Sequence, residues 1–193
     1  MGSVARLVLV GVLALSVTGC GGGAKSEADQ SSDALNRGLK AHTAGKYDEA
    51  QLAYFEALSH DAKNKFAFFN LGQIAQTQKR DQSAEVYYRL ALEIDARFGP
   101  ALFNLAILRA NAGATAEAID LYRRAVQADA NAAGAYYNLA LLLRQTGATA
   151  EANQMFQRAQ QLDPKLVPPT PSATPASTTA PGPTVRPSAT PTR

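Results

Sequence analysis

The chain repeats itself every 34 residues from Ser31 to Leu166, four times and without an insertion. Most of the aligned columns hold small residues, and one holds an aromatic residue in every row. The small columns are Gly38, Gly72, Ala106 and Ala140; Ala50, Ala84, Ala118 and Ala152; and Ala57, Ala91, Ala125 and Ala159. The aromatic column is Tyr54, Tyr88, Tyr122 and Phe156, and an acidic column is Asp61, Asp95, Asp129 and Asp163. A period of this length predicts a stack of identical units, each of which buries its apolar face against the next.

Each row is predicted to form two helices. In the second row, apolar residues recur at three-to-four spacing over Phe66–Gln78 and again over Gln82–Ile94. The break between them falls at residues 79–81, where the other rows place Gly45, Gly113 and Gly147. Glycine suits a left-handed helix C-cap, and Thr115 and Thr149, just beyond, are predicted to N-cap the following helix.

With these columns in every row, the segment resembles the tetratricopeptide repeat. The resemblance implies an all-α fold, an α-solenoid of four helical hairpins at 31–64, 65–98, 99–132 and 133–166. It also implies that the first helix of each hairpin lines a concave groove.

The two ends of the array depart from the pattern. The first row has Asp33, Arg37 and Lys40 where later rows have apolar residues, so its first helix is expected to turn a charged side outward. At the other end Gln160 replaces an aliphatic residue, and Asp163-Pro164 is expected to stop the chain before a further helix. The four repeats are thus predicted to form a closed unit.

The first twenty residues are predicted to be an export signal. One Arg precedes an apolar run, Leu7–Val17, that is too short for a bilayer-spanning helix, which needs about 20 residues. Val17-Thr18-Gly19-Cys20 resembles the bacterial lipobox, which implies removal of residues 1–19 and acylation, including palmitate, at Cys20. Gly21 after the cysteine implies delivery to the outer membrane in a host that has one. The alternative is an ordinary signal peptide cleaved nearby, or an uncleaved anchor, with an incidental Cys20.

Segments without apolar periodicity flank the repeats. Residues 20–30 contain a glycine run and are predicted to be a flexible tether. Nine of the ten prolines lie at Pro164 or beyond, so residues 167–193, rich in Pro, Thr and Ser, are predicted to be a disordered tail. The tail is read as a solvated segment, with a wall-threading or O-glycosylated stalk as the alternative.

Composition argues against several classes of function. The formal net charge is only +3, and basic residues alternate with acidic ones, so no nucleic acid partner is expected. His42 and His60 lie on different predicted helices without further ligands, and no phosphate-binding loop occurs, so no catalysis, metal or cofactor is expected. The ridge formed by Arg89, Arg123, Arg124 and Arg158 is read as a solvated face, with contact to anionic lipid or glycan as the alternative.

The predicted groove is apolar and carries one Asn per repeat. Its predicted peptide-binding residues are Phe66, Phe69, Phe103, Ile107, Tyr137 and Leu141, with Asn36, Asn70, Asn104 and Asn138. The Asn column resembles the asparagine ladders that hold an extended peptide backbone in some tetratricopeptide proteins, because an amide both donates and accepts hydrogen bonds. Alternatively, the apolar residues complete the core and the Asn side chains bond a neighbouring helix. The carboxylate clamp of related proteins is rejected, because Phe69, Phe103 and Ile107 stand where charge or polarity is needed.

These observations predict a lipid-anchored, non-enzymatic scaffold of the cell envelope that holds a peptide or helix segment of another envelope protein. Small tetratricopeptide lipoproteins of two kinds resemble it, namely pilotins and adaptors for peptidoglycan hydrolases. The alternative is a structural protein that acts on the cell wall, or spans the periplasm, through its Pro-rich tail.

Overall fold

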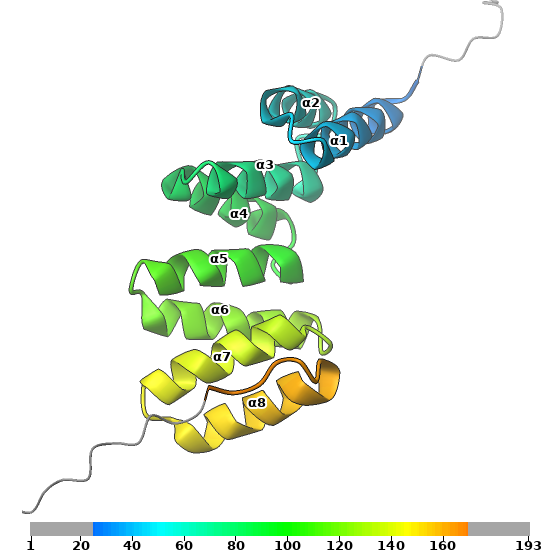
Figure 1. Ribbon diagram of the computed structural model, residues 1–193. Helices are drawn as coiled ribbons and strands as arrows, with labels where there is room; N and C mark the ends of the chain where they lie inside the picture. Colours follow the sequence, from blue (N-terminus) through cyan, green and yellow to red (C-terminus); the bar gives the residue numbers. More distant parts are fainter. Residues whose placement is uncertain (1–24, 170–193) are drawn as a thin grey trace, which may run out of the picture. The chain divides into compact units, whose positions relative to one another are not determined.

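The computed structural model describes residues 25–169, and in that range the chain forms eight α-helices and no strands (Figure 1). The helices are α1 Glu27–Thr43, α2 Tyr47–His60, α3 Lys65–Thr77, α4 Asp81–Ile94, α5 Gly99–Asn111, α6 Thr115–Ala128, α7 Ala133–Gln145 and α8 Thr149–Leu162. The predicted all-α solenoid is confirmed. The chain divides into unit 1, Met1–Ala67, and unit 2, Phe68–Arg193, which are described separately below.

A left-handed residue ends the first helix of each hairpin. Gly45, Gly113 and Gly147 have φ angles of 74°, 77° and 87°, as their spacing predicts, and Lys79 takes the same place with φ 57°. The predicted threonine N-caps are wrong. Thr115 and Thr149 are the first helical residues, and the N-cap positions fall on Ala114 and Ala148, which make no side-chain cap bond.

The small columns let the helices of a hairpin approach closely around the aromatic residue. Tyr88 is fully buried, and a Cβ added to Gly72 would lie 2.5 Å from its ring. Gly38 faces Tyr54 in the same way in unit 1. The core of unit 2 is continuous from Ala75 to Ala152, so neighbouring hairpins bury each other's apolar faces.

The aspartate column builds the turn that leads out of each second helix. The carboxylate of Asp95 accepts a hydrogen bond from the backbone N–H of Arg97 at 3.0 Å, and the corresponding bonds to Asp61, Asp129 and Asp163 measure 2.9, 2.8 and 3.0 Å. The turn at Asp163-Pro164 therefore has the same hydrogen bond as three turns that lead into helices, whereas no helix follows it as far as residue 169. Pro169 disfavours helical backbone at Pro168, whereas a single proline in the same column, Pro100, is compatible with the first turn of α5.

The N-terminal boundary also differs from the prediction. Helix α1 begins at Glu27, so the last residues of the predicted tether, 27–30, are helical. A capping box explains this start: the Ser26 hydroxyl accepts from the N–H of Asp29 at 3.1 Å, and the Asp29 carboxylate accepts from the N–H of Ser26 at 3.3 Å. Arg37 and Lys40 are exposed on α1, as expected of a charged outer side.

The predicted export signal, Cys20 and the tail beyond residue 169 lie outside the described residues. Between residues 25 and 169, none of the helices combines the length and the apolarity needed to cross a bilayer.

Candidate peptide-binding site

Helices α3, α5 and α7 of unit 2 carry most of the predicted groove residues. Phe69 lies on α3, Phe103 and Ile107 on α5, and Tyr137 and Leu141 on α7. Two of the predicted residues, Asn36 on α1 and Phe66 at the start of α3, belong to unit 1, where Asn36 is exposed and Phe66 is 49% exposed. The candidate site described here is therefore the part of the groove in unit 2.

A hollow of about 290 Å³ lies between α5 and α7, and we call it the α5–α7 hollow. It brings together three predicted site residues that are far apart in sequence, Ile107, Asn138 and Leu141. The rest of its lining is Ala110, Asn111, Tyr122 and Leu142, so none of the lining residues carries a charge. Such a surface suits an uncharged, partly apolar ligand with a few hydrogen-bonding groups.

The groove aromatics also serve the fold. Phe103 packs edge-on against Tyr122 with ring centroids 5.9 Å apart, and Tyr137 packs in the same way against Phe156 at 5.5 Å. Phe69 contacts both Tyr88 and Phe98, at 5.9 and 5.4 Å. These first-helix aromatics are partly buried, so each presents one part to the core and another part to solvent.

Two asparagines of the column bond the buried tyrosine of the preceding hairpin. The side-chain amide of Asn104 donates to the Tyr88 hydroxyl at 3.3 Å, and that of Asn138 donates to the Tyr122 hydroxyl at 3.2 Å. Asn70 is buried, at 8% exposure. Burial raises the pKa of both tyrosines to about 12, so their hydroxyls stay protonated at physiological pH. These hydrogen bonds therefore join neighbouring helices. Each uses one N–H of the Asn amide, which has a second N–H and a carbonyl oxygen that can also form hydrogen bonds.

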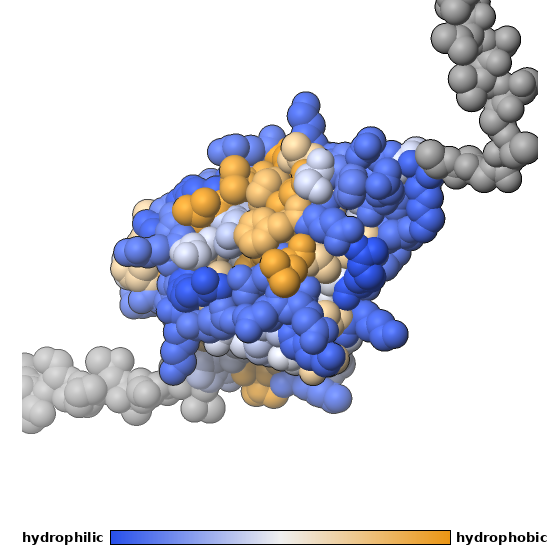
Figure 2. All heavy atoms as spheres, turned by 90° about the horizontal axis from the view of Figure 1, so that it is seen from above, coloured by the Kyte–Doolittle hydropathy of each residue, from blue (hydrophilic) through white to orange (hydrophobic). Residues whose placement is uncertain are grey.

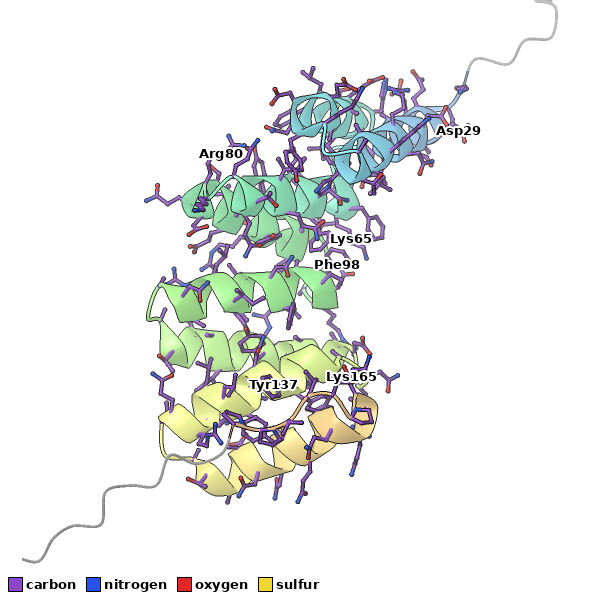
Figure 3. The ribbon with its side chains drawn as sticks, in the orientation of Figure 1. Asp29, Lys65, Arg80, Phe98, Tyr137 and Lys165 are labelled. Atoms are coloured by element: carbon purple, nitrogen blue, oxygen red, sulfur yellow. The ribbon has the colours of Figure 1, made fainter. Side chains whose placement is uncertain are left out.

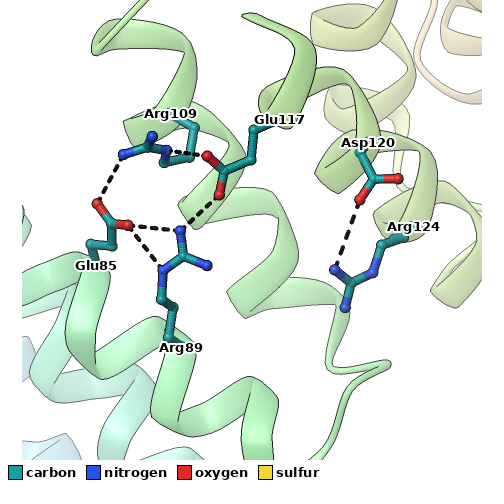
Figure 4. A network of polar contacts seen from close by, with 6 residues as sticks. All are labelled: Glu85, Arg89, Arg109, Glu117, Asp120 and Arg124. Carbon is teal, nitrogen blue, oxygen red and sulfur yellow. Dashed lines mark hydrogen bonds and ion pairs between the residues drawn. The ribbon is translucent and has the colours of Figure 1, made fainter. Parts of the chain in front are cut away.

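The arginine ridge is paired within the chain. Arg89 and Arg109 both contact Glu85 and Glu117, with contacts of 2.7 to 3.2 Å that join α4, α5 and α6 (Figure 4). Arg123 pairs with Glu151 at 2.9 Å. Arg124 and Arg158 donate to the backbone carbonyls of Ala96 and Ala130, both at 3.2 Å. These contacts show that the arginines of the ridge bond groups of neighbouring helices and of the turns between hairpins.

The histidines have local partners. His42 lies edge-on to Tyr47 and Tyr54, and burial lowers its pKa, which favours the neutral ring. His60 approaches Glu27 with Nδ1 to Oε2 at 2.6 Å. Within the described range, no three His, Cys, Asp or Glu side chains are grouped so that they could hold a metal ion.

Sequence reasoning missed two features. Figure 2 shows an apolar patch on the face that it views, and unit 1 exposes Leu52 by 72% and Phe55 by 47%. The signal was available, because Phe55 occupies the column of Arg89 and Arg123. The second feature is the contact of Tyr137 and Arg144 with the segment after α8, which had no signal in the repeat pattern.

Comparison with known proteins agrees with this architecture. Two family models described as tetratricopeptide repeat match residues 67–98 and 103–166. A search of curated protein sequences returned no match.

Several solved structures share the fold. A crystal structure of MamA is 19% identical with a TM-score of 0.62, covering 70% of this chain and 79% of that chain. A structure from a functional characterization of Pseudomonas aeruginosa PilF is 23% identical with a TM-score of 0.64, and the match covers 72% of this chain and 65% of that one. The first tetratricopeptide domain of Spaghetti (RPAP3), bound to the HSP90 peptide SRMEEVD, is 22% identical with a TM-score of 0.59, covering 62% and 98%. Residues 67–98 and 103–166 therefore match the tetratricopeptide repeat, and the solved structures share its all-helical fold, which is suited to protein–protein interaction.

Proposed function

We propose that the chain is a non-enzymatic adaptor that holds an extended or helical segment of another cell-envelope protein in the groove of unit 2. The observation that carries the proposal is the α5–α7 hollow, where Ile107 and Leu141 provide apolar contact and Asn138 provides an amide. Apolar surface supplies affinity, and a few placed polar groups orient a bound backbone. The peptide held by the Spaghetti (RPAP3) domain gives a precedent for the fold.

The proposed ligand differs in charge from the acidic HSP90 peptide of that neighbour. No charged side chain lines the hollow, and Phe69, Phe103 and Ile107 stand where a carboxylate clamp would need charge or polarity. A buried carboxylate without a partner would lose more hydration free energy than apolar contacts return. The proposed partner segment is therefore uncharged where it crosses the hollow.

The groove can be tested by photo-crosslinking in the native envelope. A photoreactive residue at Ile107 or Leu141 is expected to capture one partner, whereas the same residue at Val86, which is 56% exposed on α4, is a matched control outside the hollow. Ile107→Ser together with Leu141→Ser should abolish capture by a reporter placed at Ala110 and leave the helical circular dichroism intact. Equal capture of the same protein from Val86 would contradict the groove assignment.

Membrane attachment through acylated Cys20 is the second part of the proposal. Two acyl chains give stable attachment where one gives marginal binding, at about 0.8 kcal/mol per buried methylene. Cys20→Ser should therefore move the exported protein from the membrane fraction to the soluble fraction. A protein that stays membrane-bound after this change would contradict lipid anchoring at Cys20.

A structural role of the Pro-rich tail is the second candidate function. It is favoured by the concentration of prolines after Pro164. Deletion of residues 168–193 discriminates between the two candidates: loss of partner capture points to the tail, and retained capture points to the groove. Within the groove proposal, pilotin-like and hydrolase-adaptor-like forms differ in the captured protein, which the crosslinking experiment identifies.

A further inference from the structure

The segment after α8, residues 163–169, begins with a turn at Pro164-Lys165 and then runs without regular secondary structure along α7 (Figure 1). Two of its backbone carbonyls are held by groove side chains: the Tyr137 hydroxyl donates to the Val167 carbonyl at 3.3 Å, and the Arg144 guanidinium donates to the Pro169 carbonyl at 2.9 Å. Figure 3 shows Tyr137 on α7 beside this segment. The chain's own backbone is thus bound by residues of the predicted peptide-binding face.

The burial pattern of the segment is that of an extended chain pressed against a surface. Leu166 and Pro168 are half-buried, whereas Lys165, Val167 and Pro169 are exposed. Alternate burial is expected when successive side chains point to opposite sides. The two accepting carbonyls, on Val167 and Pro169, are also two residues apart, so both can point toward α7.

The Arg144 guanidinium is positioned by the Phe156 ring. Its guanidinium lies over the Phe156 ring, 5.0 Å from the centroid, while it donates to Pro169. Tyr137 packs edge-on against the same ring. A ring that positions both donors reduces the side-chain entropy lost when they bind a carbonyl.

The residue that holds Pro169 shares a face of α7 with a residue that lines the α5–α7 hollow. Tyr137, Leu141 and Arg144 have the spacing i, i+4 and i+7, so they share one face of α7, and Leu141 lines the hollow. One helical turn, about 5 Å, separates Leu141 from Arg144 along α7. The last described residue is therefore held by a side chain on the face of α7 that also carries Leu141, a lining residue of the hollow.

Residues 170–185 are uncharged like the lining of the hollow, and they are long enough to reach across it. They contain no charged residue and consist of Pro, Ala, Ser, Thr, Gly and one Val, and the hollow has no charged lining. In a polyproline-like conformation they can reach about 50 Å at about 3.1 Å per residue, far more than the hollow requires. A Pro-containing chain also loses less conformational entropy on binding than a flexible one.

We propose that residues 170–185 bind in the α5–α7 hollow of the same chain, as an extended ligand that starts from the carbonyls held by Tyr137 and Arg144. The inference rests on the proposed function only in sharing its surface. It assigns the ligand class, an uncharged Pro-containing segment, and it means that a partner has to displace the chain's own tail.

The test uses the full-length chain with a photoreactive residue at Ala173. Crosslinked peptides are identified by mass spectrometry after dilution, in a mixture of isotopically light and heavy protein. Crosslinks within one molecule to the peptides that contain Ile107 or Leu141 are expected. Tyr137→Phe combined with Arg144→Gln should lower their yield at least about threefold, since both hydrogen bonds that hold the start of the segment are lost.

Arg158→Gln is the matched control, because Arg158 also donates to a backbone carbonyl, that of Ala130, but lies away from the hollow. It should leave the yield unchanged. Crosslinks spread evenly over the chain would overturn the proposal. Crosslinks between light and heavy molecules would assign the site to a second copy's tail and would overturn binding in cis.

A second readout needs no crosslinker. Deleting residues 170–193 should shift the methyl resonances of Ile107 and Leu141 and leave that of Ile119, which lines a different hollow, in place. Unchanged Ile107 and Leu141 methyls would count against the proposal. Neither readout involves a partner protein. If the chain captures no partner, the proposed binding of residues 170–185 can still be supported. If the chain captures a partner but its tail does not bind in the hollow, only the tail proposal is contradicted.

Discussion

At the scale of single residues, one backbone position in each hairpin needs a left-handed conformation, and this chain fills it in two ways. Gly45, Gly113 and Gly147 adopt it without a Cβ penalty, whereas Lys79 adopts it at φ 57°. No side chain or backbone atom lies within 4 Å of a Cβ built on any of the three glycines, so the requirement there is conformational. Lys79 is therefore a local weakness in the α3–α4 hairpin.

Lys79→Gly is expected to stabilise unit 2. Removing the Cβ relieves a penalty of about 1 kcal/mol, partly offset by the greater freedom of glycine in the unfolded chain. Urea unfolding should give a free energy of unfolding higher by roughly 0.5 kcal/mol. The reverse change, Gly113→Lys, is the matched control and should lower it by about 1 kcal/mol. An unchanged midpoint in both variants would show that the turn carries no conformational penalty.

At the scale of secondary-structure elements, hydrogen bonds and ion pairs between residues 28 apart join successive hairpins. Arg89 reaches Glu117 at 2.7 Å, and Arg123 reaches Glu151 at 2.9 Å. Arg124 and Arg158 bond the turn that connects the preceding hairpin to their own, also across 28 residues. These polar contacts define how neighbouring helices are aligned with one another. The small columns alone do not specify this alignment, because alanine contacts are the same at each repeat.

The network of Figure 4 predicts a pH-dependent effect of Arg89→Met. The hydrogen bond from Arg89, with smaller contributions from Arg109, holds the pKa of Glu117 below its usual value. A carboxylate with a lowered folded-state pKa adds stability above its unfolded pKa of about 4.3, and this stability is lost as the pH falls through the folded pKa. Arg89→Met should thus cost on the order of 1 kcal/mol at pH 7 and much less below pH 3.

Thermal unfolding of both proteins between about pH 2 and pH 7 measures this difference. Arg124→Met is the control, because Arg124 makes one long ion pair, 3.9 Å to Asp120, and a bond to the Ala96 carbonyl. Its cost should vary little with pH. A cost of Arg89→Met that stays constant over the whole range would contradict a stabilising role for the ionised Glu117.

At the scale of the whole molecule, unit 2 has one continuous core in which α5 and α6 are covered from both sides. Leu102 and Leu105 of α5 are fully buried in it. In such arrays each hairpin is stabilised chiefly by its neighbours, so the middle of the unit should open last. The segment after α8 covers part of α7 in extended form, where a fifth hairpin would begin.

Leu105→Ala is predicted to weaken all of unit 2. Replacing a fully buried leucine by alanine lowers the free energy of unfolding by about 2 to 5 kcal/mol. Because the hairpins of unit 2 share one core, the neighbouring hairpins are destabilised as well. Hydrogen exchange of the full-length chain should accelerate in α4, α5, α6 and α7 together. Val86→Ala, at an exposed position, should leave exchange almost unchanged. Acceleration confined to α5 would show that the hairpins open independently.

The sequence alone determined the helical hairpins, their spacing and the residues that pack inside them. This was possible because the same burial environment recurs every 34 residues, and small and aromatic columns record it directly. Tyr88 against Gly72, and the left-handed glycines, follow from packing and backbone conformation within one hairpin.

Only the tertiary structure decided what the polar columns do. Asn138 bonds Tyr122 across 16 residues, Arg123 pairs with Glu151 across 28, and Arg144 holds the Pro169 carbonyl across 25. Each contact joins different helices, or a helix and the segment that follows it. An Asn or Arg column looks the same in the sequence whether its side chains face solvent, a partner or their own chain. A polar side chain bonds whichever group the packed helices bring within about 3 Å, and that proximity arises only when the hairpins stack.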